Sequence, residues 1–351
     1  MSSKVMQRSL YGFLQITGVI AAVRWFRRNQ LTAVCLHGVV SDEGGVGVAP
    51  TRWQLRASDL DRQISILKKK YRFVSLDEIE DVLRNGNGGG KPCCFVTLDD
   101  GYSSAWKVAW PILKKHGVPG VVFVATEHMA AGKLFWWDRL DYTMMHMPKS
   151  IRSVTVGGHN IPVTLDSRKA RAASARFVTQ HSRGLFEHEQ ARFKALEAFI
   201  QEYEREEWLE DLKSWVGVMT SDDVAEASDS GFEIGSHTVH HYRLGDLDRE
   251  AARKELRESK AAIEHVTKKT CRSFCYPEGS LNDISRDEVE SAGYEFAFCS
   301  EAGFNGPDSD RLALRRWHLP NGGSSAYVLA RVSGVEHAVL KIRTLLTGGR
   351  K

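Results

Sequence analysis

The sequence predicts an α/β protein in which parallel strands form a closed or nearly closed β/α barrel. Two observations lead to this fold class. Short apolar runs without polar alternation recur along the chain, which is typical of strands that are buried on both faces of a parallel sheet. Segments with helical periodicity separate these runs, and the alternation of strand and helix continues over most of the 351 residues. One large β/α domain accounts for both observations.

The expected elements follow the chain in order. Each strand is a short apolar run, and the six expected strands are Leu31–His37, Cys93–Leu98, Gly120–Ala125, Phe232–Gly235, Arg272–Tyr276 and Glu295–Cys299. The helical segments between them lie near Leu55–Lys70, Leu76–Leu83, Ser103–His116, Ser221–Ser230, Arg249–Val266 and Ile284–Ala292. The last helix is followed by Gly293, and glycine commonly ends helices because it adopts left-handed backbone angles.

One stretch interrupts this pattern between residues 151 and 216. Residues 151–165 (IRSVTVGGHNIPVTL) predict a β-hairpin that turns at Gly157 and Gly158, and residues 167–216 predict two polar, charge-rich helices. We expect an insertion in a long strand–helix connection, where such segments shape access to a site. The predicted organisation is an N-terminal helix over residues 1–30, a barrel over 31–325 with the insertion at 151–216, and a C-terminal helix or tail over 326–351.

Composition narrows the classes of function. The chain is 42% hydrophobic and 26% charged, as a folded protein is, and its formal net charge of +4 is modest for its length. Because no basic residues cluster as a nucleic-acid interface requires, we expect no nucleic-acid partner. Five of the six cysteines lie in apolar runs, and no pair has a C-x-x-C or zinc-knuckle spacing. This usage predicts buried structural thiols in a reducing compartment, and so a cytoplasmic protein.

The N-terminal segment carries the one signal for a membrane. Ser9–Val23 is uncharged and largely apolar, and it is flanked by arginines at positions 8, 24, 27 and 28. As a helix it would reach only about 22 Å, short of a hydrocarbon core of about 30 Å, and no small-x-small cleavage site follows it. Two interpretations stay open: a helix docked on the domain, or an interfacial helix whose arginines contact anionic lipid headgroups. The second adds peripheral membrane contact through residues 9–28 and a location at the membrane face.

The first motif with chemical content is FVTLDDG at residues 95–101. Apolar residues run to the end of a predicted strand, and two carboxylates, Asp99 and Asp100, then precede Gly101. Neighbouring residues of an ideal strand point to opposite faces, but a turn at Gly101 would let both acids reach one site. The alternative is an ordinary Asp-Asp-Gly turn with solvated acids.

The second motif is EIGSHTVHHY at residues 233–242. His237 and His241 are four positions apart, so on a helical turn their imidazoles would share one face and could hold one metal ion. His240 could take the place of His241 on spacing alone. With Asp100, the two histidines would form a two-His-one-carboxylate site, which leaves coordination positions open for water and substrate.

The third motif is RSFCYPEG at residues 272–279. Arg272 opens a predicted strand that ends at Tyr276 and Pro277. A guanidinium group can bind and orient a carboxylate through two hydrogen bonds, so Arg272 is a candidate partner for an acid of the site. The alternative is a cation at the edge of a strand, with Tyr-Pro as a simple strand end.

These three motifs, in this order, resemble those of the NodB-homology polysaccharide deacetylases of carbohydrate esterase family 4. The family's T-[FL]-D-D-G matches residues 97–101, its H-[ST]-x-x-H matches 237–241 and its R-x-F-x-Y-P-x-G matches 272–279. The match extends over about Leu31–Asn321 apart from the insertion. The resemblance implies a deformed (β/α)7 barrel and a divalent metal, usually zinc and sometimes cobalt or nickel.

The resemblance also implies roles for single residues. Asp99 would be the general base that activates water at the metal, and Arg272 would pair with this base. The backbone N–H of Tyr276 would donate to the oxyanion, and Pro277 would line the groove. The residues that would hold the ion are Asp100, His237 and His241.

Two histidines compete for the role of general acid. Many family members carry a late L-x-H motif whose histidine protonates the leaving amine; the late candidate here is His318 in RRWHLPN, without that motif's strand context. His37 in AVCLHGVV ends the first predicted strand and resembles the histidine of the Y-H-x-V motif of permuted exopolysaccharide deacetylases, with Leu36 in place of tyrosine. We assign the acid to His37, with His318 as the alternative. Arg315 and Arg316 resemble an arginine near the end of related domains and are candidates for contact with the site.

The predicted function is the metal-dependent removal of N-acetyl groups from a polysaccharide, an oligosaccharide or a lipid-linked amino sugar. The expected partner is therefore a carbohydrate. The alternatives are an O-acetyl esterase acting on a glycan, an amidase acting on a non-sugar amide, and a non-catalytic glycan-binding relic of the fold. Every metal ligand and the base are present, which argues against the relic.

Overall fold

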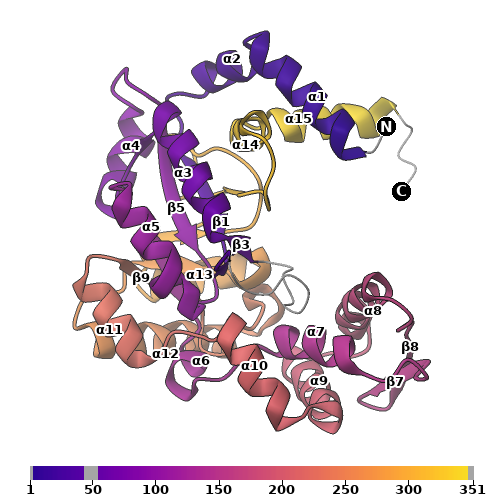
Figure 1. The fold of residues 1–351 in the computed structure, drawn as a ribbon. Helices are drawn as coiled ribbons and strands as arrows, with labels where there is room; N and C mark the ends of the chain where they lie inside the picture. The colour runs from indigo at the N-terminus through magenta and orange to yellow at the C-terminus, as the bar shows by residue number, and fades with distance from the viewer. Residues whose placement is uncertain (1–2, 43–53, 347–351) are drawn as a thin grey trace.

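A barrel of parallel strands surrounded by helices forms the centre of the molecule (Figure 1). The computed structural model describes residues 3–42 and 54–346, with side chains from residue 9 onward. The outer ends of the expected N-terminal segment 1–30 and C-terminal segment 326–351 lie outside the described residues.

Seven parallel strands make up the barrel wall. Their order is β11-β10-β9-β6-β5-β1-β12, and the short β4 (Arg72–Phe73) pairs with the start of β5. A backbone bridge between Phe298 and Leu314 joins β11 to the residues that lead into β12, so the ring is nearly closed. This closure confirms the predicted (β/α)7 barrel. The strands are β1 (Thr32–Leu36), β5 (Cys93–Leu98), β6 (Val121–Val124), β9 (Glu233–Ser236), β10 (Ser273–Cys275), β11 (Phe296–Phe298) and β12 (Arg316–His318).

The apolar runs form strands because both of their faces are buried. Alternate residues point into the barrel, where Phe95 and Phe123 each pack against Phe298 with ring centroids 5.5 and 5.6 Å apart. The residues between them, such as Val96 and Leu98, face the helices in the main core. The six predicted strands are confirmed. The seventh, β12, was missed because it is three residues long and two of those are Arg and His.

The helices on the barrel lie close to their predicted positions. The helix predicted at 103–116 begins with a π-helical segment (Ala105–Ala109) and becomes α-helical at Trp110. Pro111 explains the change of geometry, because it cannot donate the backbone hydrogen bond that a regular turn needs. The others are α3 (Ala57–Lys70), a 3₁₀ turn (Leu76–Glu78) with α4 (Ile79–Asn85), α5 (Trp110–Lys115), α6 (Thr126–Ala131), α11 (Ser221–Asp229), α12 (Arg249–Thr267) and α13 (Asp283–Ser291). Outside the barrel, β2 (Val39–Val40) pairs with β3 (Leu55–Arg56).

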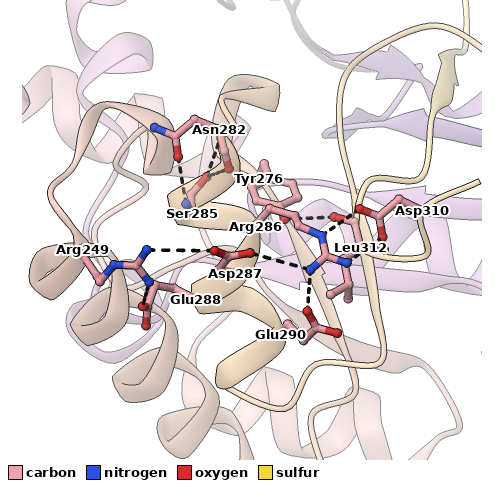
Figure 2. Close-up of polar contacts among 10 residues, drawn as sticks. All are labelled: Arg249, Tyr276, Asn282, Ser285, Arg286, Asp287, Glu288, Glu290, Asp310 and Leu312. Atoms are coloured by element: carbon pink, nitrogen blue, oxygen red, sulfur yellow. Dashed lines mark hydrogen bonds and ion pairs between the residues drawn. The ribbon is translucent and has the colours of Figure 1, made fainter.

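Polar contacts of α13 hold the segment that closes the barrel (Figure 2). Asn282 caps the helix by accepting the backbone N–H of Ser285 at 2.8 Å. Arg286 donates to Asp310 at 2.9 Å, and Glu288 pairs with Arg249 of α12 at 2.7 Å. Helix α13 therefore ties α12 to the loop that leads into β12.

The insertion between β6 and β9 forms a packed unit with its own core. The hairpin predicted at Gly157 and Gly158 is confirmed, whereas three α-helices follow it instead of the predicted two. Helix α7 packs against α8, α9 and α10, so the packed unit starts before residue 151. The elements are α7 (Trp136–His146), β7 (Ser153–Val156), β8 (His159–Pro162), α8 (Arg168–His181), α9 (Glu189–Tyr203) and α10 (Glu206–Val216).

The two ends of the described chain meet beside the barrel. The expected N-terminal helix is two helices, α1 (Ser3–Ile16) and α2 (Val19–Phe26), which are separated at Gly18 with a φ of 79°. Helix α1 packs against α14 (Ser325–Val332), which in turn packs against α15 (Val335–Leu346). Among the described residues, no single helix is both long and apolar enough to cross a bilayer. Helices α1 and α2 meet that requirement only as a pair, and they are bent by 67°.

Candidate active site

Two of the sequence motifs converge at the carboxyl ends of β5 and β9. Asp100 follows β5, and His237 and His241 follow β9. The Nε2 atoms of the two imidazoles lie 3.5 and 3.4 Å from the same oxygen, Oδ1 of Asp100. All three side chains are buried. Residues separated by about 140 positions in the sequence thus form one compact group.

The backbone after β5 turns both acids toward this centre. Strand alternation places Asp99 on the interior face of the barrel with Phe95 and Thr97. Asp100 would then point outward, but its φ of 74° and the φ of 73° at Gly101 turn the chain. A side chain at Gly101 would bring its Cβ within 2.9 Å of Val124 on β6, so only glycine allows this approach. The predicted turn is confirmed.

The histidine loop differs from the predicted helical turn. Residues 237–241 form an irregular loop in which Thr238 and His241 have φ values of 66° and 59°. Left-handed angles are unusual for a β-branched residue, so the fold holds Thr238 in a strained conformation. His240 turns away from the centre, and its Nδ1 lies 2.5 Å from Glu255. The choice of His241 over His240 is therefore made by the loop and by Glu255, not by helical spacing.

The group fits a divalent cation. Ligand atoms that bind one ion at about 2.0 to 2.2 Å stand about 3.0 to 3.5 Å from one another, and each of the two nitrogens lies at such a distance from the Asp100 oxygen. All three ligand atoms lie within 4.8 Å of one another. Nδ1 of His237 lies 2.7 Å from the carbonyl oxygen of Cys275, which can only accept, so Nδ1 carries the proton. The Nε2 lone pair then faces Asp100, as in a metal-ligating histidine oriented by a backbone carbonyl.

A second set of donors, Asp99, His237 and Cys275, fits an ion less well. Burial raises the pKa of the Cys275 thiol, so the thiol stays protonated and is a poor ligand. Both carboxylate oxygens of Asp99 are already bound by a guanidinium group. The Asp100 group is the better candidate. Burial on its own would raise the pKa of Asp100, but His37 and the two neighbouring imidazoles outweigh it and lower this pKa.

The partner of Asp99 is Arg316 of β12. Its two Nη atoms donate to Oδ1 and Oδ2 of Asp99 at 2.7 and 2.8 Å, and both side chains are buried. The same guanidinium donates to Thr97 at 2.8 Å and to the carbonyl of Cys299 at 2.9 Å. Burial alone would raise the pKa of Asp99, but the Arg316 charge and hydrogen bonds lower it to about 2. Asp99 is therefore an ionised, rigidly held carboxylate.

The predicted pairing of Arg272 with Asp99 is wrong. Arg272 precedes β10, so it lies at the opposite end of the barrel from the acids, which follow β5. Its guanidinium pairs with Asp77 and, at 2.8 Å, with Glu295, and it is partly exposed. The motif places Arg272 at the start of the strand, whereas the acids lie near the other end. The four residues from Arg272 to the site end of β10 span about 13 Å, which is farther than the arginine side chain can reach back.

The predicted oxyanion donor is also engaged elsewhere. The backbone N–H of Tyr276 donates to the carbonyl of Phe298 at 3.0 Å as part of the sheet. The hydroxyl of Tyr276 donates to the carbonyl oxygen of Leu312 at 2.9 Å, in the loop that leads into β12 (Figure 2). The Tyr276 N–H is therefore not free to bind an oxyanion. Pro277 does follow β10 at the site end of the barrel, but its side chain is buried.

Comparison with known proteins identifies the family. The sequence profile of the family described as polysaccharide deacetylase matches residues 86–297, which is more than half of the chain. The chain belongs to the polysaccharide deacetylase family. Membership confirms the family that the three motifs predicted.

Relatives and solved structures agree with this assignment. The putative polysaccharide deacetylase YxkH of Bacillus subtilis is 26% identical over 256 residues, which are 73% of this chain and 62% of that protein, so the chain spans less than two thirds of this relative. The Streptococcus pyogenes deacetylase PplD has a TM-score of 0.56 at 16% identity and covers 86% of this chain and 98% of its own. IcaB from Ammonifex degensii has a TM-score of 0.54 at 17% identity, with 87% and 97% covered. At these identities the structures show a shared fold.

Both candidate acids of this deacetylase-family chain lie at the same mouth of the barrel. His37 follows β1 and His318 ends the neighbouring β12, and their rings are stacked with centroids 5.9 Å apart. The expectation that His318 lacks a strand context is wrong, since β12 pairs with β1. His318 Nδ1 lies 3.1 Å from the Cys35 sulfur. Burial, reinforced by the nearby His37 and Arg316, lowers the pKa of His318 to about 4.

The insertion reaches the site of this family member from two sides. Trp137 at the start of α7 packs on His241 with ring centroids 4.6 Å apart, and its Nε1 donates to Tyr102 at 3.1 Å. Arg183 of the insertion pairs with Glu278, which follows Pro277. Trp137 stays partly exposed, so it forms an aromatic wall beside the candidate metal ligands. The sequence signal for this wall was the FWWD run that follows β6, and the contact with His241 was not predictable from it.

Acid should destabilise the protein through His128, which is buried on α6 and contacts Phe135. Burial outweighs the hydrogen bond from His128 to the Lys133 carbonyl and lowers the pKa to about 3. The unfolded chain binds a proton below about pH 6.5 and the folded chain only near pH 3. The free energy of unfolding should therefore fall by about 1.4 kcal/mol per pH unit between these values.

Urea unfolding between pH 7 and 4.5 measures this dependence. His128→Gln should make it shallower, whereas His159→Gln, at an exposed histidine, should not. Equal slopes for the unmodified chain and His128→Gln would contradict the assignment.

Proposed function

We propose that this chain is a metal-dependent hydrolase that removes N-acetyl groups from a carbohydrate. The observation that carries the proposal is the buried group of Asp100, His237 and His241 directly beside the ionised Asp99. Neutral imidazoles and a carboxylate on one side of an ion leave its other positions open to substrate and water. The family assignment supports a carbohydrate acyl group as the substrate.

The chain's own residues would hold a cation and manage protons. Asp100, His237 and His241 would bind the ion, which when present polarises an acyl carbonyl and lowers the pKa of water. Asp99 would accept the proton of the attacking water. Each of its oxygens uses one lone pair on Arg316 and keeps a second for this task. Arg316 would keep the Asp99 carboxylate ionised and would hold it in one orientation.

His37 is the better candidate for the general acid. The leaving amine needs a proton, so the acid must hold one at neutral pH. His318 has a pKa near 4, so at neutral pH it is almost entirely unprotonated. His37 lies at the partly exposed mouth of the barrel, where it interacts with both Asp99 and Asp100. We therefore assign the proton donor to His37 and a packing role against Cys35 to His318.

A pair of matched variants separates the two histidines. His37→Gln should lower kcat by about 10²- to 10⁴-fold on an amide substrate, because the leaving amine is then expelled without a proton. His318→Gln should lower kcat by less than about tenfold. The measurement is acetate release at saturating substrate, with metal content as the control for the integrity of the site. A larger loss for His318→Gln would reverse the assignment.

Metal removal tests the proposed function itself. Dialysis against a chelator should abolish acetate release from N-acetylglucosamine oligomers, and zinc, cobalt or nickel should restore it together with about one bound ion per chain. The bound ion is counted by elemental analysis, independently of activity. Undiminished activity in metal-free protein would contradict the proposal.

A substrate panel distinguishes the remaining alternatives. Acetate release from O-acetylated but not N-acetylated sugars would favour an esterase, and release from small non-sugar amides alone would favour an amidase. Binding of the oligomers without release by the metal-loaded chain would favour a non-catalytic relic.

A further inference from the structure

The two ends of the described chain build one surface at a distance from the active site. Helix α1 is anchored by Tyr11, which is 2% exposed and contacts Tyr327 of α14 with ring centroids 5.4 Å apart. Helix α15 follows α14 directly and faces α1 and α2 across a common cavity. An open cavity of about 840 Å³ separates α1–α2 from α15, and its lining includes the apolar side chains of Leu14, Val23 and Val339. We call α1, α2 and α15 with this cavity the terminal surface.

Exposed apolar side chains concentrate on the terminal surface. Among the described residues, thirteen large hydrophobic side chains are exposed, and ten of them lie on these three helices. They include Phe13, Phe26 and Leu346, which are 64%, 82% and 82% exposed. Such clustering marks a binding surface, whereas single exposed apolar residues are ordinary. The ten are Leu10, Phe13, Ile16, Val19, Trp25, Phe26, Leu340, Ile342, Leu345 and Leu346.

The charge of the terminal surface is mostly basic. Its acidic residues are Glu336 of α15, which is buried and pairs with Arg331, and Asp308 in the lining of the cavity. Residues 1–41 and 337–351 contain nine of the chain's 48 basic residues and none of its 44 acidic ones. The rest of the chain therefore carries a formal net charge of −5. Arg28, which follows α2, stacks on Trp25 with its guanidinium carbon 4.0 Å from the ring centroid, so basic and aromatic groups lie together at the end of this helix. Exposed apolar groups among predominantly basic residues are complementary to an anionic lipid surface.

The shape of the terminal surface favours helices that lie in the membrane interface. The pair α1–α2 is bent by 67°, and Tyr11 and Ile20 are both buried against the domain. One face of each helix is thus held by protein while the opposite face is exposed. A bilayer-spanning segment would have to break the contacts of Tyr11 with α14.

We propose that the terminal surface docks this protein on an anionic phospholipid bilayer, with α1–α2 and α15 contributing jointly. Aromatic and aliphatic side chains enter the acyl boundary, and Arg24, Arg27, Lys341 and their basic neighbours contact the headgroups. The inference reaches beyond the proposed deacetylation, because it concerns a surface away from the metal ligands.

Vesicle co-sedimentation of the full chain tests the proposal. The chain should bind vesicles of phosphatidylcholine with about one third phosphatidylglycerol at least tenfold more tightly than pure phosphatidylcholine vesicles, and 0.5 M salt should weaken this binding. The charge variant Arg24→Gln/Arg27→Gln/Lys341→Gln should weaken it by about 100-fold, since each basic residue near the surface contributes about fivefold.

Apolar variants test whether both ends take part. Phe13→Ser/Phe26→Ser on α1–α2 and Leu345→Ser/Leu346→Ser on α15 should each weaken binding at least tenfold. The matched control is Phe177→Ser/Leu281→Ser/Ile284→Ser, which changes the other three exposed large hydrophobic residues of the described chain and should leave binding unchanged. Unchanged vesicle binding by the α15 variant would contradict the claim that both ends of the chain contribute. Equally weakened binding by the control variant would contradict the placement of the lipid-binding site on the terminal surface.

A second copy of this chain is the alternative partner for the terminal surface. Light scattering after size exclusion should give a monomer mass at the vesicle-binding concentration. A dimer that the α1–α2 variant dissociates, together with no preference for anionic vesicles, would overturn the proposal in favour of an interface between copies. Acetate release is measured separately, so failure of lipid binding leaves the proposed chemistry untouched.

Discussion

Replacing Asp99 by asparagine should lower kcat for acetate release by about 10²- to 10⁴-fold while leaving one metal ion bound. Asparagine has nearly the same shape as aspartate but cannot accept a proton from water at neutral pH. The three side chains proposed to hold the ion are unchanged in this variant. The measurement combines steady-state kinetics on N-acetylglucosamine oligomers with elemental analysis of the same sample.

Asp100→Asn is the matched control for this experiment. Asp100 presents the oxygen that faces both imidazoles at 3.5 and 3.4 Å, so its replacement should lower metal content as well as activity. The two variants should therefore differ in metal content, because Asp99 is needed to accept the proton and Asp100 is needed to bind the ion. Loss of metal from Asp99→Asn, with retention in Asp100→Asn, would exchange the roles that we propose.

Replacing Arg316 by methionine should cost about 3 to 5 kcal/mol of the free energy of unfolding, because it leaves a buried carboxylate without its counter-charge. Arg316 binds Asp99 through two hydrogen bonds and also donates to Thr97, Cys299 and Cys275 inside the barrel. Without the guanidinium, burial would raise the pKa of Asp99. The cost should thus be largest at neutral pH and shrink as the pH falls and the carboxyl is protonated. Urea unfolding of the unmodified chain and of Arg316→Met at pH 7 and pH 5 measures the cost of the substitution at each pH.

Arg272→Met provides the comparison at the other end of the barrel. Arg272 pairs with Asp77 and Glu295 at the surface, and exposed ion pairs contribute about 0 to 1 kcal/mol. Activity should persist in this variant, whereas Arg316→Met should lose it even in the fraction that folds. Arg316→Lys keeps the charge and should recover part of the stability but not the bidentate geometry. Inactivation by Arg272→Met with an active Arg316→Met would restore the pairing expected from the motif.

Most of the barrel could be predicted from local patterns. Strands buried on both faces must be apolar throughout, so six of the seven were visible as runs of hydrophobic residues. The exception was β12 (Arg316–His318), whose strand conformation depends on pairing with β1 and not on its own composition. The same pairing gave His318 the strand context that its sequence neighbourhood lacks.

The members of the candidate site were largely predictable, but their geometry was not. Asp99, Asp100, His237 and His241 follow strands, and the carboxyl ends of parallel strands meet at one edge of a barrel. The selection of His241 over His240 depends on left-handed backbone angles at Thr238 and His241, which no helical spacing describes.

The sequence by itself determined the strand-and-helix order, the family and the residue types available for chemistry, because each of these is encoded in short contiguous patterns. Only the tertiary structure decided which arginine neutralises the base and which end of the barrel a motif residue faces. Arg316 lies 217 residues from Asp99 along the chain. It reaches Asp99 because β12 closes the ring against β1, whereas Arg272 begins its strand at the far end. Long-range pairing of this kind follows from strand order and direction, and neither is written in any local stretch of residues.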